Sequence, residues 1–473
     1  MANLKDRLTY PVFGQIAQVA AEKNIKVYVI GGYVRDLLLD IPCKDLDFVV
    51  QGSGIEFAEA VGHKLKCKQN VTVFKNFGTA MLRYKGIELE FVGARKESYN
   101  RNSRKPIVEE GTLEDDQKRR DFTVNALAIS LNSEDYGELV DPFNGLEALK
   151  KGIIKTPLDA DITFSDDPLR MLRAIRFACR LGFVIESETF NAITRNRDRI
   201  EIISKERIVD ELDKIMMTKK PSIGFSLLDK CGLLEKILPS LAKLKGVEIK
   251  EGKGHKDNFL HTLQVVDNVA QNSDNMWLRY AALFHDIAKP NVKKFNGGTW
   301  TFHNHEFIGA KMIPQIFKSL KMPLNDRMKY VQKLVGMHHR AIPISNDEIT
   351  DSAVRRLMYD AGEDLDDLLL LCEADITSKI EEKKLKFLNN YKTVRRKIKE
   401  LEQKDFVRTW QPPVDGNLIM ETFDLKPSRT VGEIKDVIKD AILDGKIENS
   451  FEAAYALMIE LGEKHGLKPV KNN

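Results

Sequence analysis

Residues 31–50, GGYVRDLLLDIPCKDLDFVV, decide the fold that we expect for this chain. The apolar run Val27–Ile30 comes directly before them and predicts a buried strand. That strand leads into Gly31 and Gly32, where backbone amides can approach an anion without a side chain in the way. A short helix that carries Arg35 is expected to follow.

Two acidic residues, Asp45 and Asp47, follow in what the pattern predicts as a second strand. Because they are two residues apart, their carboxylates project from the same face. Such close negative charges repel each other unless a cation lies between them, and Mg²⁺ binds one or two carboxylates together with substrate phosphates. Together with the glycines, the stretch predicts a site for a metal-bound nucleoside triphosphate. The alternative is a structural glycine turn and a solvated Asp-x-Asp.

GGYVRD at 31–36 followed by DLD at 45–47 resembles the signature of the polymerase-beta-like nucleotidyltransferases. Within them it resembles the branch of the class II tRNA nucleotidyltransferases (CCA-adding enzymes) and the related poly(A) polymerases. The resemblance implies an α+β fold class: a nucleotidyltransferase head with a mixed sheet, then all-helical neck, HD and tail domains. The expected bounds are 1–150 for the head, 151–245 for the neck, 246–400 for the HD domain and 401–473 for the tail.

The composition agrees with a chain of several globular domains. The 473 residues include 42% hydrophobic and 30% charged side chains, and the net charge of +4 says little about nucleic acid. Five scattered cysteines without a Cys-x-x-Cys argue against a disulfide scaffold or a zinc knuckle. We therefore expect a reduced, cytoplasmic setting. Neither a signal peptide nor a run long enough to cross a membrane is visible, so neither export nor membrane insertion is expected.

A third carboxylate is expected on a neighbouring strand of the head. The predicted strands here are Val71–Phe74, Thr79–Tyr84 and Ile87–Val92. Glu88 and Glu90 share a face of the last strand. The resemblance selects Glu90, because it stands five residues before Arg95, as the group that positions or deprotonates an attacking hydroxyl. A solvent-exposed strand carboxylate is the alternative.

Residues 98–118 are rich in charge and loop formers, which predicts a mobile loop over the site. The sequence RRDFTVNALA at 119–128 then resembles the second motif of the family. By that resemblance Arg120 and Asp121 contact the ribose, and Asn125 lies near the triphosphate. Asp121 could instead cap the helix that it opens.

The segment DDPLRMLRAIR, residues 166–176, predicts a helix with a basic face. An aspartate before a proline is an ordinary helix start. Arginines recur from there at helical spacing, at positions 170, 173, 176 and 180. We therefore expect an anion along this stripe.

The residues DDPLR resemble the Glu-Asp-x-x-Arg element by which class II enzymes choose the incoming base. Asp167 and Arg170 are one helical turn apart. The carboxylate can accept from the exocyclic amine of cytosine or adenine, while the arginine donates to the adjacent ring nitrogen. Uracil and guanine present the inverse pattern, and each unpaired group would cost roughly 1 to 3 kcal/mol. Asp166 departs from the usual glutamate, which leaves its role open.

Seven of the nine histidines fall between His255 and His339. Their order with aspartate resembles the HD phosphohydrolase domain, which binds one or two divalent metals. The resemblance gives His261, His285, Asp286 and Asp375 as core ligands, with His305 and His338 for a second metal or for phosphate. Imidazole plus carboxylate suits transition metals as well as Mg²⁺, so the metal is not identified. His255, His303 and His339 are expected next to the ligands or on the surface. A structural set and a folded but idle site are the alternatives.

The rest of the chain predicts helices. In the neck these are Glu206–Met217 and Phe225–Leu238, with a stop at Cys231-Gly232. A charged helix is expected at 380–405, and after Pro412 a closing pair of helices. This part resembles the tail by which the HD-containing enzymes hold the acceptor and T arms of tRNA.

The resemblance implies metal-dependent transfer of CMP and then AMP, from CTP and ATP, to the 3′-hydroxyl of immature tRNA. Asp45 and Asp47 would hold Mg²⁺ and Glu90 would assist at the hydroxyl. The predicted nucleotide-binding residues are Gly31, Gly32, Arg35, Arg120, Asp121, Asn125, Asp167, Arg170, Arg173 and Arg176. The alternatives are a poly(A) polymerase, a CC-only or A-only enzyme, an HD phosphohydrolase with a nucleotide- or RNA-binding head, and an RNA-binding scaffold. The HD substrate and the oligomeric state are not indicated.

Overall fold

The computed structural model describes most of the chain. The described residues are 3–75, 78–98, 107–340, 350–378, 380–405 and 412–470. They form two compact units, Met1–Ala242 and Lys243–Asn473, which are treated separately below. Within the described ranges, no helix combines the length and the apolar character that crossing a membrane requires.

The first unit contains a seven-stranded sheet with the order β3-β4-β5-β2-β1-β8-β9. The strands are β1 (Val27–Ile30), β2 (Asp45–Val50), β3 (Val71–Phe74), β4 (Thr79–Tyr84), β5 (Ile87–Gly93), β8 (Ala128–Ser130) and β9 (Leu139–Val140). β2 and β5 are parallel, whereas the other neighbours are antiparallel. The sheet is therefore mixed, and the predicted strands are confirmed to within one residue.

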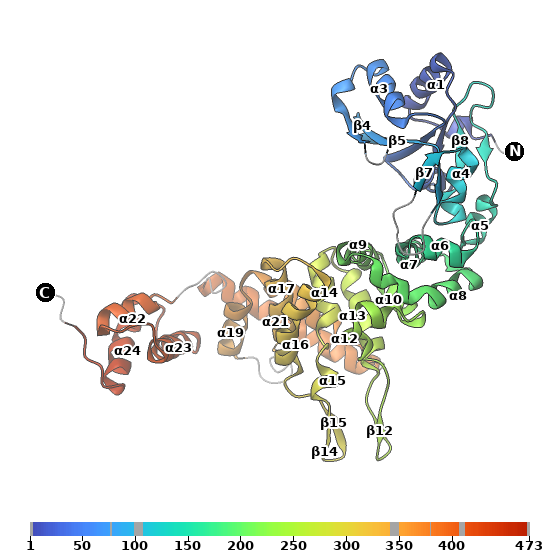
Figure 1. Cartoon of the computed structure of the whole chain (residues 1–473). Helices are drawn as coiled ribbons and strands as arrows, with labels where there is room; N and C mark the ends of the chain where they lie inside the picture. The colour runs from blue at the N-terminus through green and yellow to red at the C-terminus, as the bar shows by residue number, and fades with distance from the viewer. Residues whose placement is uncertain are drawn as a thin grey trace. The chain divides into compact units, whose positions relative to one another are not determined.

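Helices α1 (Val12–Lys23) and α3 (Gly54–Lys64) cover one face of this sheet (Figure 1). Alternation along β2 and β5 turns Phe48 and Phe91 to that face, where their rings stack with centroids 4.9 Å apart. Phe13 of α1 and Phe57 of α3 pack onto the pair. Burying each ring contributes on the order of 2 kcal/mol. The acidic residues between these positions consequently lie on the opposite face.

The loop predicted for residues 98–118 is wrong for its second half. Strands β6 (Arg95–Ser98) and β7 (Ile107–Glu110) pair as a hairpin, and helix α4 (Leu113–Lys118) follows. A capping box between Thr112 and Asp115 starts this helix. These elements are too short for a hydrophobic periodicity to be recognised in such a charged segment, so the sequence did not predict them. Residues 99–106 lie outside the described residues.

Helices make up most of the rest of the first unit. They are α5 (Gly145–Lys151), α6 (Ala160–Asp166), α7 (Leu169–Leu181), α8 (Ser187–Asn196), α9 (Lys205–Met216), α10 (Pro221–Lys230), α11 (Leu233–Ile237) and α12 (Pro239–Ala242). Gly232, at φ 78°, separates α10 from α11, as expected. A short parallel ribbon, β10 (Ile153–Ile154) with β11 (Val184–Ile185), was not anticipated.

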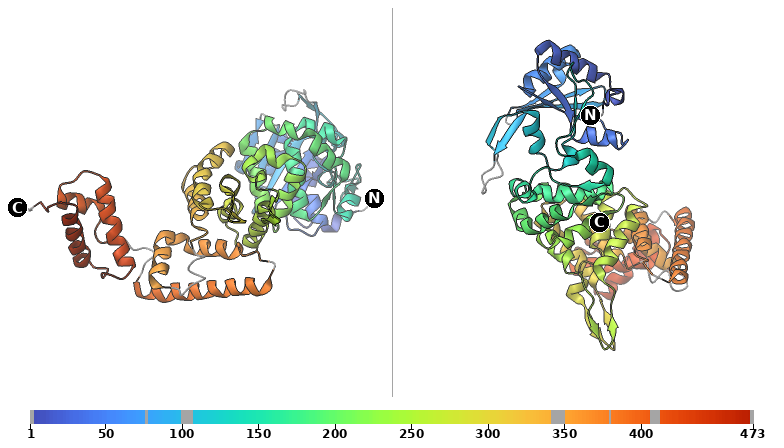
Figure 2. Two further views of the ribbon diagram at one scale, coloured as in Figure 1. Left: turned by 90° about the horizontal axis from the view of Figure 1, so that it is seen from below. Right: turned by 90° about the vertical axis from the view of Figure 1, so that its right-hand side faces the viewer.

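The second unit is mainly helical. It contains α13 (Asn258–Ala270), α14 (Met276–Phe284), α15 (Lys289–Val292), α16 (His305–Leu320), α17 (Asp326–Met337), α19 (Asp351–Ala361), α20 (Leu365–Ala374) and α21 (Glu381–Asp405). Two antiparallel ribbons, also unanticipated, are β12 (Ile249–Lys250) with β13 (Lys253–Gly254), and β14 (Lys294–Asn296) with β15 (Thr299–Thr301). Both ribbons project from the same end of the helices (Figures 1 and 2).

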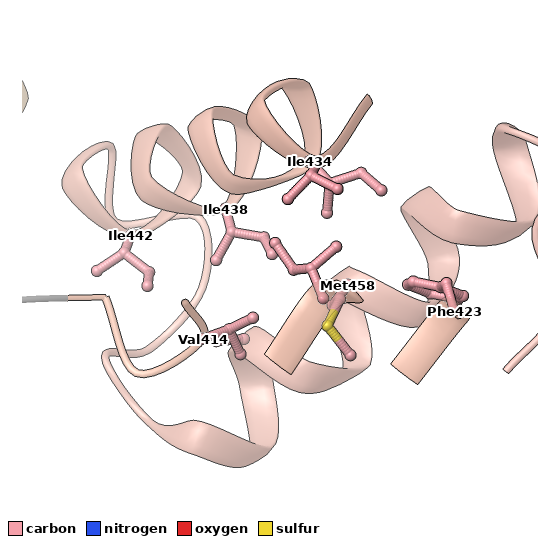
Figure 3. Close-up of a cluster of buried hydrophobic side chains, with 9 residues drawn as sticks. Val414, Phe423, Ile434, Ile438, Ile442 and Met458 are labelled. Atoms are coloured by element: carbon pink, nitrogen blue, oxygen red, sulfur yellow. The ribbon is translucent and has the colours of Figure 1, made fainter. Parts of the chain in front are cut away.

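The tail consists of three helices rather than the predicted pair: α22 (Gly416–Phe423), α23 (Arg429–Leu443) and α24 (Phe451–Lys464). The missed break follows Asp424, whose left-handed backbone (φ 51°) ends α22. The three helices enclose an apolar core, which Figure 3 shows: Val414, Phe423, Ile434, Ile438, Ile442 and Met458. Arg356 of α19 donates to Asp444 at the end of α23, at 2.8 Å.

Candidate active site and candidate metal centre

The open face of the sheet carries four carboxylates in register. Asp47 on β2 lies directly opposite Glu90 on the parallel strand β5, and Asp45 lies opposite Glu88. Side chains at paired positions of neighbouring strands point to the same face, so the four acids form one patch. Arg83 of β4 engages Glu88 at 2.8 Å. Glu90 therefore remains as the carboxylate that is available beside Asp47.

Asp47 has an unusual protonation equilibrium. Burial raises the pKa of its carboxyl to about 6, the carboxylates of Glu90 and Asp45 add to the rise, and the Arg120 guanidinium opposes it. A partly buried carboxylate among other acids gains more from a cation than an exposed one does. The donor set, carboxylate oxygens alone, is the set that Mg²⁺ prefers. These residues fit a divalent metal.

Gly31 shapes the turn beside these acids. Its φ is 82°, and a Cβ there would lie 2.7 Å from Arg120 Nη1 and 3.4 Å from Asp47 Oδ2. Only glycine fits this position. Its amide, however, donates to the Leu127 carbonyl at 3.0 Å. The prediction that both glycine amides face an anion is thus wrong for Gly31, because the Leu127 carbonyl, just before β8, already accepts that hydrogen bond. Gly32, the first residue of α2 (Gly32–Leu38), lines the cavity described below.

Arg35 is buried below the turn. Its Nε donates to Asp36 Oδ1 at 2.7 Å and its Nη1 to Asn125 Oδ1 at 2.6 Å. Asn125 in turn donates to Asp121 Oδ1 at 2.9 Å. A continuous hydrogen-bonded chain therefore fixes three of the predicted nucleotide-binding side chains before any ligand arrives.

Asp121 is held by an arginine from the neck. Arg173 of α7 approaches its Oδ2 at 2.7 Å. Burial by itself would raise the pKa of Asp121, but Arg173 and the Asn125 amide outweigh burial and lower the pKa to about 2. Asp121 precedes only a 3₁₀ turn, Thr123–Asn125, so its predicted alternative as an α-helix cap is wrong.

The arginines of α7 do not all stay free for an anion. Arg176 lines the cavity, yet its Nε donates to the buried Glu211 of α9 at 2.5 Å. The Phe177 ring lies beneath three guanidiniums, of Arg35, Arg173 and Arg176, at 5.0, 5.5 and 4.1 Å from its centroid. Glu211 therefore neutralises part of the positive charge of the arginine stripe, and the Phe177 ring packs against two of its arginines, Arg173 and Arg176.

Asp167 and Arg170 lie one turn apart at the start of α7. Asp167 Oδ1 accepts from the Leu169 amide at 3.1 Å, so it also starts the helix, while its Oδ2 lies 3.5 Å from Arg207 of α9. Arg170 Nη2 donates to the Arg119 carbonyl at 2.5 Å. Both side chains face the cavity with hydrogen-bonding capacity left over.

A single cavity of about 680 Å³ collects these groups. It is lined by nine basic side chains and five carboxylates, an environment suited to a polyanion with its cation. Eleven of the predicted residues line it: Gly32, Arg35, Asp45, Asp47, Arg120, Asp121, Asn125, Asp167, Arg170, Arg173 and Arg176. The two other predicted residues do not line the cavity. Gly31 lies in the turn beside Asp47, and Glu90 lies next to Asp47 on the neighbouring strand.

The lining residues that sequence reasoning missed include Asp36, Lys44, Phe177 and Arg207. Phe177 stands four residues after Arg173, so a stripe of arginines on one helix could have indicated an aromatic support at that spacing. Arg207 arrives from α9, and no spacing in the sequence connects it with Asp167.

In the second unit, four histidines and two aspartates converge. His261 Nε2 lies 2.8 Å from Asp375 Oδ1, and His285 Nε2 lies 3.2 Å from Asp286 Oδ2. His305 Nε2 and His338 Nε2 lie 3.3 and 3.9 Å from the other oxygen of Asp286. All six predicted ligands are brought together, although they span more than a hundred residues of sequence.

The hydrogen bonds of these histidines leave their Nε2 atoms for a ligand. The Nδ1 atoms of His285, His305 and His338 face backbone carbonyls at 2.7 to 2.8 Å. Their Nε2 atoms and Asp286 Oδ1 are buried and have no hydrogen-bond partner. Buried polar atoms without partners are costly, and this arrangement fixes the tautomer that a metal needs. The residues therefore fit one or two divalent metals.

His339 belongs with this centre as well. It groups with His305 and His338 as a second set that could hold an ion, beside the set of His261, His285 and Asp286. The sequence expectation placed His339 next to the ligands or on the surface. Its position directly after a ligand, at the end of α17, was the available signal.

Comparison with known proteins agrees with this architecture. Family models match as a Poly A polymerase head domain at 27–155, a probable RNA and SrmB-binding site of polymerase A at 182–245, and an HD domain at 258–380. A Multifunctional CCA protein of Shewanella frigidimarina (strain NCIMB 400) is 31% identical over 366 residues, 74% of this chain and 84% of that protein. The chain belongs to the tRNA nucleotidyltransferase and poly(A) polymerase family. It is therefore a nucleotidyltransferase, and the predicted family is confirmed.

Two further relatives are similar to this chain. The A-adding tRNA nucleotidyltransferase of Aquifex aeolicus (strain VF5) is 33% identical over 294 residues, 61% of this chain and 35% of that protein. The Thermotoga maritima CCA-adding enzyme, solved in complex with tRNA, has a TM-score of 0.62 at 22% identity and covers 97% of this chain and 99% of its own. The likeness of this nucleotidyltransferase to that structure confirms the predicted fold class.

Proposed function

We propose that the nucleotidyltransferase adds CCA to the 3′ end of tRNA, from CTP and ATP. The observation that carries the proposal is that one cavity holds both the Asp45 and Asp47 carboxylates and the Asp167 and Arg170 side chains. A site that joins a metal-binding patch to a base-sized donor and acceptor pair can transfer a nucleotide and inspect it without a template. Curated relatives named for CCA addition support this specificity.

The phosphates of the nucleotide would bind where the cavity is most basic. Arg120 and Lys44 flank the carboxylates, and Gly32 opens the turn. Mg²⁺ held by Asp45 and Asp47 would neutralise charge on the phosphates. Glu90, next to Asp47, would accept the proton of the attacking 3′-hydroxyl. The preformed network around Arg35 and Asn125 keeps these groups in place, so catalysis would consist mainly of positioning and charge neutralisation.

Asp121 and Arg120 would hold the ribose, while Asp167 and Arg170 would read the base. Cytosine and adenine both offer an exocyclic amine to Asp167 and an unprotonated ring nitrogen to Arg170. Uracil and guanine would leave both protein groups unpaired. We expect a preference for CTP and ATP of about tenfold or more for each lost hydrogen bond.

Extension of a truncated tRNA tests the specificity. The protein is incubated with Mg²⁺ and a tRNA that lacks its CCA end, and each nucleoside triphosphate is supplied alone or with the others. Three added nucleotides from CTP and ATP, and none from UTP or GTP, are the expected products. A long A tail would instead identify a poly(A) polymerase, and one A added only to a tRNA ending in CC would match the Aquifex relative's name.

A second activity, metal-dependent phosphoester hydrolysis, is proposed for the second unit. It is favoured by the buried, partnerless Nε2 atoms around Asp286. A bound metal would lower the pKa of a water that can attack a phosphoester. Hydrolysis of bis(p-nitrophenyl) phosphate, measured with Mg²⁺, Mn²⁺, Ni²⁺ and Zn²⁺ in turn, tests the activity and identifies the metal. Absence of turnover with every metal would assign the centre a structural role.

The proposed substrates imply a cytoplasmic enzyme. The five cysteines are unbridged, which agrees with a reducing compartment. We further propose that the head, neck, HD and tail bounds expected from the sequence apply, and that the basic side chains of 401–473 contact tRNA. Separately expressed 1–245, assayed for stability and nucleotide binding, would test the boundary between neck and HD domain.

A further inference from the structure

Two β-ribbons of the second unit take no part in either proposed chemistry. We call residues 247–255 and 293–302 the basic ribbons; they contain β12 with β13 and β14 with β15. They lie side by side, because Trp300 Nε1 donates to the Lys253 carbonyl at 3.0 Å and packs edge-on against His255. Figures 1 and 2 show both projecting beyond the helices.

The basic ribbons carry more positive than negative charge, since four lysines stand against Glu248 and the exposed Glu251 of the first turn. Lys250, Lys253 and Lys294 are exposed, and within the described part of the chain no carboxylate lies within ion-pair distance of them. Lys293, in contrast, is paired with Glu248. Three unpaired lysines on adjacent narrow ribbons attract an anion with a repeating charge.

Aromatic rings accompany these lysines. Phe295 and Trp300 are partly exposed, with ring centroids 5.1 Å apart. Lys250 Nζ lies 5.2 Å from the Phe295 centroid, and Lys293 Nζ lies 5.4 Å from that of Trp300. Cations interleaved with accessible rings are the combination that binds single-stranded nucleic acid, because the lysines contact phosphates and the rings stack on bases. An acidic protein surface would use the charge but has no comparable use for the rings.

Where each ribbon joins the helices, hydrogen bonds connect it to a histidine of the His/Asp centre, directly or through Thr377. Phe302, at the end of one ribbon, accepts from His305 Nδ1 through its carbonyl at 2.7 Å. At the end of the other, Lys256 Nζ donates to Thr377 Oγ1 at 3.5 Å, and the same hydroxyl lies 2.8 Å from His261 Nδ1. A strand held along the ribbons would therefore run towards the metal ligands.

We propose that the basic ribbons bind the backbone of single-stranded RNA and lead the strand to the His/Asp centre. The destination of the strand rests on the proposed phosphoester hydrolysis, whereas the binding does not. The ribbons thus assign the centre a nucleic-acid substrate rather than a small metabolite.

Replacement of the three lysines tests the binding. The K250Q/K253Q/K294Q variant of the full chain is compared with K318Q/K392Q/K399Q, which removes three exposed lysines from α16 and α21 of the same unit. Fluorescence anisotropy with a short, unstructured, labelled RNA is measured between about 50 and 200 mM salt. We expect the ribbon variant to bind about tenfold or more weakly, with the slope of log K against log salt reduced by about 2, and the control to match the native chain. Equal behaviour of the two variants would overturn the proposal.

A photo-crosslinker at Asn296, in the exposed turn of the second ribbon, gives an independent readout. Crosslinking to the labelled RNA is expected, and crosslinking to no RNA, or only to an added acidic protein, would overturn the proposal. In the metal-loaded protein, the ribbon variant should raise KM for an RNA phosphoester and leave hydrolysis of bis(p-nitrophenyl) phosphate unchanged. Should the native chain hydrolyse neither substrate, the proposed hydrolysis fails, while the anisotropy and crosslinking still decide whether the ribbons bind RNA.

Discussion

At the residue scale, the active-site cavity depends on side chains that are fixed before substrate arrives. Asn125 connects the buried Arg35 to Asp121, and Arg173 closes the chain from α7. Arg35, Asn125 and Asp121 are buried, Arg173 is partly exposed, and each group is satisfied by the next. Removing one member leaves another unpaired, at a cost of about 1 to 3 kcal/mol, so small changes here affect both stability and function.

Replacing Gly31 by alanine should abolish most of the nucleotidyl transfer. The new Cβ would meet Arg120 Nη1 at 2.7 Å and displace it from Asp47, in addition to straining a backbone at φ 82° by about 1 to 3 kcal/mol. The measurement is kcat/KM for tRNA extension, with urea unfolding for stability. Gly86→Ala is the matched control, since Gly86 has φ 80° and open space around it. Equal losses of activity in both variants would show that backbone strain alone, rather than the contact with Arg120, explains the requirement for glycine.

Asp121→Asn should make stability depend differently on pH. The folded-state pKa of Asp121, about 2, lies below its ordinary value of 3.8, so the ionised carboxylate stabilises the fold above about pH 4. The variant should lose about 2 kcal/mol of unfolding free energy at pH 7, and its deficit should shrink as pH falls from 4 towards 2. Urea unfolding at a series of pH values measures this. A deficit that stays constant with pH would contradict the assigned ion pair with Arg173.

At the scale of elements, the two sites are assembled differently. The acid patch needs only the parallel pair β2 and β5, whose register places Asp47 opposite Glu90. The candidate metal centre needs five helices: α13, α14, α16 and α17 supply the histidines in or next to a terminal turn, and Asp375 directly follows α20. The last carbonyls of a helix have no partner within it, and His285 and His338 use carbonyls of the last turns of α14 and α17 to orient their rings, while His305 uses the Phe302 carbonyl before α16.

Metal should stabilise the second unit through this centre. Binding to the folded state alone contributes about 2.7 kcal/mol when the metal concentration is a hundred times Kd. Thermal unfolding should therefore shift upward on addition of Mn²⁺ or Zn²⁺ and downward with a chelator. His285→Ala should remove most of this shift, whereas His303→Ala, which changes an exposed histidine two residues from His305, should retain it. Identical shifts in both variants would place the metal elsewhere.

At the scale of the whole molecule, the two proposed chemistries belong to separate units. The cavity residues all precede Ala242, and the metal ligands all follow Lys243. Each unit has its own core, so a change in one site need not unfold the other.

Paired substitutions should therefore separate the activities. Asp45→Ala with Asp47→Ala should reduce tRNA extension by several orders of magnitude and leave hydrolysis of bis(p-nitrophenyl) phosphate at the native rate, because these two carboxylates lie in the first unit and the His/Asp ligands lie in the second. His285→Ala with Asp286→Ala should do the reverse. A main activity that survives Asp45→Ala with Asp47→Ala and is abolished by His285→Ala with Asp286→Ala would favour an HD phosphohydrolase with a nucleotide-binding head.

The sequence by itself determined the local elements and the identities of most site residues. The strands around Asp45 and Asp47 and the arginine helix follow from short-range spacing, which a strand or a helix converts directly into shared faces. The histidine and aspartate ligands are spread over more than a hundred residues, and only the resemblance to the HD domain predicted them. Spacing cannot show which groups neutralise one another across elements. Only the tertiary structure showed that Glu211 pairs with Arg176 and that Arg207 faces Asp167. It also showed that the Gly31 amide donates to the Leu127 carbonyl. The tail break at Asp424 and the basic ribbons were likewise invisible, because elements of a few residues gain their stability from packing against distant segments rather than from their own pattern.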